Sequence, residues 1–370
     1  MIKAIKTKIY PTKTQKEYFN RCFGIRRFAW NWGVEHWDTY KSWTKLDKAW
    51  NHSEMKDEKP YLYEVNSMIK TMVFKEIAEA WSKCYKKTAK APRFKSKKRD
   101  TNRFSMFEKC SKTQKTKTIM FNKKWINLNA TRKLGRFKFK AAEDLSFLNE
   151  YRIAEWTISE KCGSYYISII YERTNHIEIN QPLDKIGIDA GMKTMLTSWN
   201  GKDFSEINLP IKILHLENKI AYLNKKLAKK KLNSISFKLI KLQISKTYEK
   251  IANIKKDLIN KIANTLAKTY KQVNYESYDF ESVLKHGKSN RKLYRLSPYM
   301  LQETIERKCN EFGSIFKLIK GEPTTQTCSG CKNVYTKEEK LTLSDRVYKC
   351  KICNLEIGRD KNSAINIYKY

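Results

Sequence analysis

Acidic residues are scarce in this sequence, and the shortage excludes several classes of protein. The 370 residues include 38 Asp and Glu against 76 Lys and Arg, which gives a formal net charge of +38 at pH 7. Repulsion among so many like charges destabilises a compact chain unless a polyanion neutralises them. An enzyme of small neutral metabolites is therefore not expected. Nucleic acid is the leading partner, and an anionic membrane surface is the alternative.

Long hydrophobic runs and signal sequences are missing as well. No stretch of 18 or more uncharged apolar residues occurs, so we expect no transmembrane helix. The first residues, MIKAIK, contain neither the apolar segment nor the cleavage site of a signal peptide. We therefore expect an intracellular protein whose nine cysteines are thiols or metal ligands rather than disulfides. The charge is spread over the whole chain, which disfavours the membrane alternative.

The N-terminal residues predict a strand followed by a helical region. Residues 1–10 alternate roughly and contain three isoleucines, and Pro11 would end this strand. Thr14-Gln15-Lys16-Glu17 fits a capping box, so a helix should begin there. Residues 14–90 are mostly helical in pattern and rich in aromatic side chains. We expect these aromatics to form a core, with base stacking as the alternative.

A period of two, typical of strands, replaces the helical pattern from about residue 105 to 172. Residues 152–161 and 165–171 predict a hairpin joined by Cys162-Gly163-Ser164. Strands thus lie on both sides of the helical region in the sequence. We expect a small β-barrel or sheet with that helical region inserted into it.

Basic residues are densest at 83–99, where nine Lys or Arg occur in seventeen positions without an acid. A charge run is often only a solvated segment, but the excess over the whole chain favours phosphate contact here. A second basic pair lies among the N-terminal aromatics. The candidate nucleic-acid-binding residues are Arg26, Arg27, Arg93, Lys95, Lys97, Lys98 and Arg99.

The C-terminal half begins with a second group of strands. Residues 185–190 and 193–199 predict two strands, with a turn at Asn200-Gly201 after the second. The segment 211–270 contains no glycine or proline, and apolar residues recur in it at heptad spacing. Asn233-Ser234 divides this segment. We expect a lysine-coated antiparallel pair of helices inserted between strands.

Four cysteines have the spacing of a metal site. Cys328, Cys331, Cys350 and Cys353 form C-x2-C-x18-C-x2-C, within the range of four-cysteine zinc sites. Two such knuckles offer four thiolates to one tetrahedral ion. A closed set of four leaves no open coordination position, so this zinc would be structural rather than catalytic.

Three acids stand out by their position at the ends of predicted elements. Asp189 follows the apolar residues Ile186-Gly187-Ile188, Glu276 ends a predicted strand, and Asp360 precedes a predicted C-terminal helix. A carboxylate at the end of a buried strand is costly unless it is paired or metal-bound. Acids on adjacent strands can converge, because the strands lie about 4.8 Å apart.

The three carboxylates, brought together, would suit two Mg²⁺ or Mn²⁺ ions about 3.5–4 Å apart. Such ions clamp the attacking and leaving oxygens of a phosphodiester. This is the layout of an RNase H-like nuclease. The three acids, Asp189, Glu276 and Asp360, are accordingly the candidate catalytic and magnesium-binding residues.

These segments resemble one family in order and in kind. GIDAGMKTMLTSWNG (187–201), NYES (274–277), TTQTCSGC (324–331), CKIC (350–353) and GRDKNSAINI (358–367) look like TnpB, the OrfB protein of insertion sequences, which is related to compact type V CRISPR nucleases. The resemblance spans about 187–370. It extends more weakly to YPTKTQ (10–15), GIRRFAWNW (24–32) and PRFK (92–95).

The resemblance implies an RNA-guided DNA endonuclease with two bound Mg²⁺ and one structural Zn²⁺. Its partners would be a guide RNA derived from the transposon end and a target DNA with a short adjacent motif, with one protein chain per RNA. It would be a cytoplasmic prokaryotic protein, associated with the nucleoid when on DNA. The positive charge agrees independently, because an RNA–DNA heteroduplex needs a positive channel.

The implied fold is multidomain, of the α/β and α+β classes. A RuvC-like (RNase H-like) nuclease domain would carry a helical hairpin and a four-cysteine zinc ribbon. A β-barrel wedge domain with an inserted helical recognition domain would precede it. The expected boundaries are 1–11 and 105–180 for the wedge domain, 12–104 for the recognition domain, 183–325 and 356–370 for the nuclease domain with its hairpin at 211–271, and 326–355 for the zinc ribbon.

Two other functions remain open at this point. A guide-dependent DNA-binding repressor without cleavage would keep the charge and the cysteines but lose carboxylates, and all three are present. An unguided zinc-ribbon nucleic-acid-binding protein would explain the charge and the cysteines but not the acids. Copurifying RNA would separate the guided functions from the unguided one.

Overall fold

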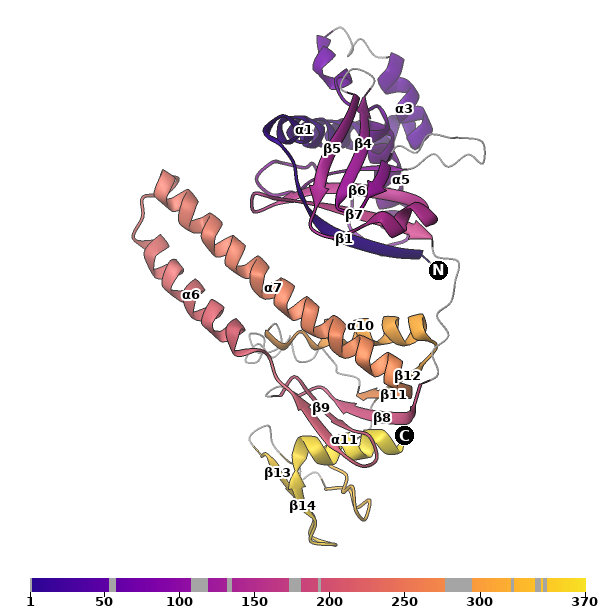
Figure 1. Cartoon of the computed structure of the whole chain (residues 1–370), viewed down its shortest axis with the longest axis vertical. Coiled ribbons are helices and arrows are strands. Elements are labelled where there is room, and N and C mark those ends of the chain that lie inside the picture. The colour runs from indigo at the N-terminus through magenta and orange to yellow at the C-terminus, as the bar shows by residue number, and fades with distance from the viewer. Residues whose placement is uncertain are drawn as a thin grey trace. The chain divides into compact units, whose positions relative to one another are not determined.

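The computed structural model describes residues 2–52, 58–107, 119–131, 135–172, 181–191, 194–276, 295–320, 323–336, 341 and 345–370. The chain forms two compact units, Met1–Asn175 and His176–Tyr370, which are described separately (Figure 1). Among the described helices, none has both the length and the apolar character needed to cross a bilayer.

The first unit packs helices against a sheet of seven antiparallel strands. The strand order is β2-β6-β7-β1-β5-β4-β3, so the N-terminal strand lies in the middle of the sheet. This order has two edges, β2 and β3, and hydrogen bonds between described residues do not close it into the expected barrel. The elements are β1 (Ile2–Tyr10), α1 (Lys13–Glu35), α2 (Trp37–Tyr40), α3 (Trp43–His52), η1 (Pro60–Tyr63), α5 (Met68–Tyr85), β2 (Asn102–Phe107), β3 (Ile119–Asn122), β4 (Trp125–Thr131), β5 (Gly135–Ala141), η2 (Ser146–Glu150), β6 (Arg152–Lys161) and β7 (Ser164–Glu172).

The first helix begins earlier than the sequence suggested. Its capping box is formed by Thr12 and Gln15 rather than by Thr14 and Glu17: the Thr12 hydroxyl accepts from the Gln15 N–H at 3.4 Å, and Gln15 Oε1 accepts from the Thr12 N–H at 3.0 Å. Both tetrapeptides fit the motif. A long-range contact favours the box at Thr12 and Gln15, because Gln15 Nε2 also donates to the carbonyl of Lys138 on β5 at 3.0 Å.

Most of the aromatic residues of the helical region form a core, as expected. Phe19 and Phe23 of α1 are buried and pack against Phe104 of β2, which in turn contacts Trp156 of β6. Trp50 of α3 is also buried, although it is distant in sequence from Phe19 and Phe23. Burial of such large rings contributes a large part of the stability of a domain of this size. Their packing role makes them unavailable as stacking platforms.

The predicted hairpin at 152–171 is present as β6 and β7. Cys162 and Gly163 at its tip have φ angles of +52° and +78°, which suits a tight two-residue turn. The side chains of β7 alternate between buried and partly exposed. The buried set is the predicted face, namely Tyr165, Ile167, Ile169 and Tyr171.

The second unit contains a mixed sheet of five strands in the order β10-β9-β8-β11-β12. β8, β9 and β10 form an antiparallel meander, whereas β11 pairs parallel with β8 and with β12. The elements are β8 (Leu183–Asp189), β9 (Leu196–Trp199), β10 (Phe204–Ile207), α6 (Ile211–Ala228), α7 (Ile235–Thr269), β11 (Tyr270–Glu276), α10 (Pro298–Phe312), β12 (Ile315–Ile319), β13 (Val347–Lys349), β14 (Glu356–Gly358) and α11 (Arg359–Lys369).

Helices cover both faces of this sheet, and the pleat of β8 determines which residues each face receives. Ile186 and Ile188 join the core formed with α7 and α10. Successive side chains of a strand point to opposite faces, so Gly187 and Asp189 face the other side. Figure 1 shows α11 on that other side of the sheet, away from α7 and α10.

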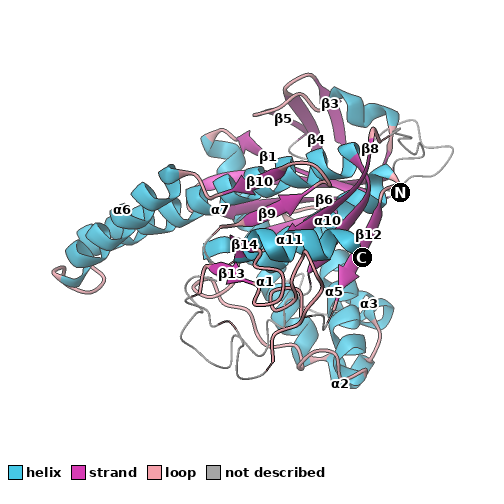
Figure 2. Ribbon diagram, turned by 90° about the horizontal axis from the view of Figure 1, so that it is seen from below, coloured by secondary structure: helices cyan, strands magenta, loops and turns pink. Residues whose placement is uncertain are grey.

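The segment 211–270 forms the predicted pair of helices, α6 and α7. Ser234 caps α7 by accepting from the Phe237 N–H at 3.1 Å, and Asn233 before it has a φ of +63°. Ile220 and Leu223 of α6 pack against α7 residues in a small core of their own. Figure 2 shows the hairpin projecting beyond the sheet of its unit.

Candidate functional site

Two of the three candidate acids end neighbouring parallel strands. Asp189 is the last residue of β8 and Glu276 is the last residue of β11. The register of these strands sets Ile188 opposite Tyr275, so the next residue on each strand is an acid. Both carboxylates therefore leave the sheet side by side at its carboxyl edge.

The same two acids face helix α11. Asn274 has the same parity as Glu276, and its Nδ2 donates to the carbonyl of Ile367 on α11 at 3.0 Å. Gly187 has the parity of Asp189 and also faces α11. Asp360 lies in the first turn of that helix. The sequence expected Asp360 just before the helix, whereas the structure includes it in the helix.

Gly187 permits the close packing that brings Asp360 to the strand ends. A Cβ at this position would lie 2.4 Å from the carbonyl oxygen of Ala364 and 2.4 Å from the backbone nitrogen of Tyr368. Both atoms belong to the backbone of α11, which cannot rotate away as a side chain can. Near the first turn of α11, a Cβ on Gly191 would lie 3.6 Å from Asp360 Oδ2. Any larger residue at 187 would push α11 off the sheet.

The electrostatics of the site are those of acids crowded together. Asp189 is only 3% exposed, and burial raises its pKa well above the usual carboxyl range, with the negative charges of Glu276 and Asp360 raising it further. Burial also raises the pKa of Glu276, which a hydrogen bond from Thr324 partly offsets. Among the described residues, Arg359 supplies a cation to the site: its Nη2 lies 3.3 Å from Asp360 Oδ1.

A buried hydroxyl pair that the sequence did not reveal supports Glu276. The Thr324 hydroxyl donates to Glu276 Oε1, and the Ser363 hydroxyl donates to Thr324 Oγ1 at 3.1 Å. Asn366 Nδ2 holds the Thr324 carbonyl at 2.9 Å. Ser363 and Asn366 are buried polar residues three apart on α11. Their spacing on the short helix was the available signal.

The donor set of this site fits a hard divalent cation. Asp189 and Glu276 lie together at the strand ends with Asp360 near them, and a positive ion would relieve the repulsion that helps to raise the pKa values of Asp189 and Glu276. Carboxylate oxygens are the ligands that Mg²⁺ and Mn²⁺ prefer.

The four cysteines lie together as their spacing predicted. Their sulfur atoms all lie within 4.8 Å of one another, with 3.6 Å between Cys328 and Cys353 and 3.5 Å between Cys331 and Cys350. These distances exclude a disulfide, whose S–S bond is about 2.05 Å. Four thiolates at about 2.3 Å from one tetrahedral Zn²⁺ would be about 3.8 Å apart. The cluster therefore fits a zinc site.

Both knuckles have the same backbone conformation. The residue after each second cysteine, Lys332 or Asn354, has a left-handed φ of +64° or +56°. The N–H of each first cysteine donates to a carbonyl five residues later, at 2.7 Å for Cys328 and 2.9 Å for Cys350. The Cys353 N–H directed at Cys350 lowers the pKa of that thiol to about 6, which favours the thiolate that a metal requires.

The first knuckle is joined to helix α11. Asn362 Oδ1 accepts from the Ser329 N–H at 2.9 Å, and Asn362 Nδ2 donates to the Thr327 carbonyl at 2.7 Å. Asn366 Nδ2 reaches the same carbonyl at 2.7 Å. Both asparagines are buried. The helix that carries Asp360 is thus hydrogen-bonded to the backbone of the cysteine cluster.

The candidate nucleic-acid-binding residues differ in their surroundings. Arg26 is 3% exposed and forms an ion pair with Glu76, and its contact with phosphate stays a prediction. Arg27 is partly buried and donates to Asn102 Oδ1 at 2.8 Å. Arg26 and Arg27 follow each other on α1, yet Arg26 pairs with α5 and Arg27 with β2, which the sequence could not reveal.

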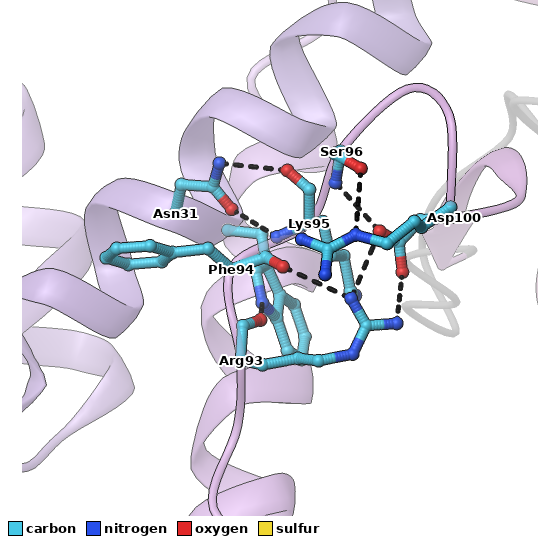
Figure 3. A network of polar contacts seen from close by, with 8 residues as sticks. Asn31, Arg93, Phe94, Lys95, Ser96 and Asp100 are labelled. Atoms are coloured by element: carbon cyan, nitrogen blue, oxygen red, sulfur yellow. Dashed lines mark hydrogen bonds and ion pairs between the residues drawn. The ribbon is translucent and has the colours of Figure 1, made fainter.

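The basic loop at 92–100 lies against α1 (Figure 3). Lys95 is partly buried over the Trp30 ring, and burial lowers the pKa of its amine to about 7. Arg93 is exposed and forms an ion pair with Asp100 at 2.9 Å. The other basic residues of the loop, Lys97, Lys98 and Arg99, are exposed.

Known proteins resemble the chain along most of its length. Residues 1–45 match the helix-turn-helix domain of IS605 OrfB proteins, residues 168–285 match the IS605 OrfB family described as "Probable transposase", and residues 299–367 match the Cas12f1-like TNB domain. A "Putative RNA-guided DNA endonuclease" of Streptomyces pristinaespiralis is 23% identical over 99% of this chain and 88% of its own length. "Putative RNA-guided DNA endonuclease InsQ" of Escherichia coli K12 is 22% identical over 99% of this chain and 91% of its own length.

Solved structures show the same fold. The protein in a Cas12f1–sgRNA–target DNA complex matches with a TM-score of 0.59 and 15% identity over 96% of this chain and 83% of that chain. The mini RNA-guided endonuclease CRISPR-Cas_phi3 matches with a TM-score of 0.55 and 8% identity over 100% of this chain and 92% of that chain. The fold is therefore a mixed α/β fold that resembles Cas12f, with a four-cysteine cluster that fits a zinc ribbon. The chain belongs to the TnpB family, the OrfB proteins of IS605.

Proposed function

We propose that the protein is an RNA-guided DNA endonuclease in which Asp189, Glu276 and Asp360 hold divalent metal for hydrolysis of DNA. The observation that carries the proposal is the position of Asp189 and Glu276, side by side at the ends of two parallel strands, with Asp360 brought to them by α11. The relatives' names describe the same activity. The site's chemistry supports it independently.

The same sheet supports a finer fold assignment. A meander of three antiparallel strands, extended by two parallel ones in the order β10-β9-β8-β11-β12, is the arrangement of an RNase H-like (RuvC) domain. We assign residues 183–325 and 356–370 to this domain, with the hairpin at 211–271 inserted and the zinc ribbon at 326–355. Residues 1–11 and 105–180 would form the wedge domain, and 12–104 the recognition domain.

The residues of the site have separate tasks. When bound, Mg²⁺ or Mn²⁺ at the three carboxylates would supply an activated water and stabilise the leaving 3′ oxygen. Asp189, the most buried of the three acids, would hold the metal together with Glu276 and Asp360. The Thr324 hydroxyl donates to Glu276 Oε1 and would thereby hold this carboxylate in one orientation. The cysteines would hold one structural Zn²⁺ and thereby keep α11 in place.

Guide recognition would depend on the positive charge rather than on these acids. A net charge of +38 suits a heteroduplex that is read by its backbone, while base pairing supplies the sequence specificity. Cleavage and guided binding should therefore separate in variants of the acidic site.

The test uses the protein bound to its guide RNA, with a matched target DNA and Mg²⁺. Asp189→Ala, Glu276→Ala and Asp360→Ala should each reduce cleavage at least 100-fold while leaving guided binding within about 2-fold. Asp184→Ala, an exposed acid at the opposite end of β8, is the matched control and should cut normally. Parent protein that binds the target and never cuts it would favour the repressor.

One further variant checks the position of the second ligand. Asp279 and Glu281 follow Glu276 in the sequence and lie outside the described residues. Asp279→Ala should be mild. If Asp279→Ala abolishes cutting and Glu276→Ala does not, the second ligand is misassigned.

A further inference from the structure

The basic loop at 92–100 is anchored to α1 on both sides of Phe94. The Arg93 carbonyl accepts from Trp30 Nε1 at 2.9 Å. Lys95 is bound twice by Asn31: its N–H donates to Oδ1 at 2.7 Å, and its carbonyl accepts from Nδ2 at 3.1 Å. Figure 3 shows these bonds meeting at the backbone around Phe94.

The loop is also closed upon itself. Asp100 accepts from the Ser96 N–H at 2.7 Å and from Arg93 Nη2 at 2.9 Å. Arg93 Nη1 donates in addition to the Phe94 carbonyl at 3.2 Å. Asp100, the acid of this loop, is thus already bound to Arg93 and to the Ser96 N–H. Backbone conformation and side-chain presentation are set before any ligand arrives.

This rigid loop exposes an aromatic ring. Phe94 is 52% exposed, and in Figure 3 its ring extends away from the polar network rather than into it. One exposed phenylalanine is ordinary on a protein surface. Here, however, three exposed cations, Lys97, Lys98 and Arg99, follow on the same loop.

We propose that Phe94 is a stacking platform for an unpaired or terminal nucleobase of the bound nucleic acid, whose neighbouring phosphates are held by Lys97, Lys98 and Arg99. An aromatic face beside cations is the usual combination for single-stranded nucleic acid, since every base has a π-face and every nucleotide carries a phosphate. Pre-ordering of the loop reduces the entropy lost on binding. A membrane would require a broader apolar patch than one ring.

The inference rests on the proposed function only in expecting a bound nucleic acid, and its test does not use cleavage. Phe94→Ala, Phe94→Trp and the parent are compared for binding of guide RNA by the free protein and of matched target DNA by the RNA complex. Tyr61→Ala, which removes a ring that is 50% exposed elsewhere in the same unit, is the control. Unchanged melting temperatures establish that the variants fold.

Phe94→Ala should weaken one of the two binding steps by about 5- to 150-fold, the range reported for loss of one base stack. Phe94→Trp should restore it, and Tyr61→Ala should leave both steps within about 2-fold. Weaker RNA binding assigns the base to the guide, and weaker DNA binding assigns it to the target. Unchanged binding in both arms, or an equal effect of Tyr61→Ala, overturns the proposal. If the nuclease proposal fails instead, Asp189→Ala will cut the target like the parent, and these binding results will be unaffected.

Discussion

Single residues of the same type serve different purposes in this protein, because burial and partners differ between them. Arg26 and Arg93 both belong to basic motifs, yet one is buried against Glu76 and the other is exposed on a loop. Asp189 and Asp184 lie on one strand, yet Asp189 is buried beside other acids whereas Asp184 is exposed. Residue type selects what a side chain can do, and its surroundings select which of these it does.

The Thr324 hydroxyl makes a residue-scale prediction. Thr324→Val keeps the shape of the side chain but leaves Glu276 Oε1 without its donor. The cleavage rate should fall about 10- to 100-fold, as for other groups that orient a metal ligand, and more Mg²⁺ should be needed for half-maximal cleavage. A Mg²⁺ titration of cleavage by the RNA-bound protein measures both effects.

Two companion variants make that experiment decisive. Thr324→Ser keeps a hydroxyl and should retain most activity, and Thr325→Val changes the neighbouring threonine and should be mild. A loss of thermal stability with an unchanged Mg²⁺ requirement would mean that Thr324 only packs.

Elements meet closely in the second unit wherever the sequence supplies a small or polar contact residue. Helix α11 lies on β8 because Gly187 has no side chain, and its other end is tied to the first knuckle by Asn362. The site is thus built by one helix that touches the sheet and the cysteine cluster at once. Substitutions in the sheet or in the cysteine cluster should therefore change the position of Asp360.

Gly187→Ala tests the contact with the sheet. The added methyl would meet the backbone of α11 at 2.4 Å, so the helix must move. We expect a loss of about 1–3 kcal/mol in the free energy of unfolding and a reduced cleavage rate. Denaturant unfolding and a cleavage assay measure the two.

Gly24→Ala provides the opposite expectation for the same chemical change. Gly24 lies within α1, and a Cβ there meets nothing within 4 Å. Alanine in a helix interior is favoured over glycine by about 0.5–1 kcal/mol, so this variant should be neutral or more stable. Equal destabilisation by both variants would refute the close-packing argument.

Cys350→Ser tests the other contact of α11. Loss of one thiolate should release the zinc, which in small modules contributes about 10 kcal/mol or more to folding. Elemental analysis should fall from one zinc per chain to nearly none, and cleavage should weaken because Asn362 loses its partner in an ordered knuckle. Cys84→Ser, a cysteine remote from the cluster in sequence, should keep its zinc. A parent protein free of zinc would contradict the assignment.

The whole molecule is dominated by its charge. Repulsion among the 38 surplus positive charges destabilises the folded state, and a bound polyanion relieves that repulsion. Guide RNA should therefore raise the melting temperature and suppress aggregation, because a ligand that binds only the folded protein stabilises it. Thermal scans with and without RNA measure this.

Salt should weaken the same complex steeply. The logarithm of the binding constant should fall linearly with the logarithm of salt concentration, with a slope of about −0.7 per phosphate contact for a single strand. A salt-independent binding constant, or an RNA-free preparation that cuts DNA equally well, would contradict the charge argument.

The sequence by itself determined the local features of this protein. Apolar periodicity located β1, the β6–β7 hairpin and the α6–α7 pair, since each depends on neighbours within a few residues. Cysteine spacing predicted the cluster because a C-x2-C knuckle is a local structure. The three acids were candidates because Asp189 and Glu276 end predicted strands and Asp360 precedes a predicted helix.

Only the tertiary structure decided the contacts between distant segments. The bond from Gln15 to Lys138 selected the first residue of α1, and Glu76 drew Arg26 into the core. Thr324 lies 48 residues after Glu276 in the sequence and acquires its role solely by folding beside it. Such contacts leave no periodic trace in the chain, because their cause is the packing of one element upon another.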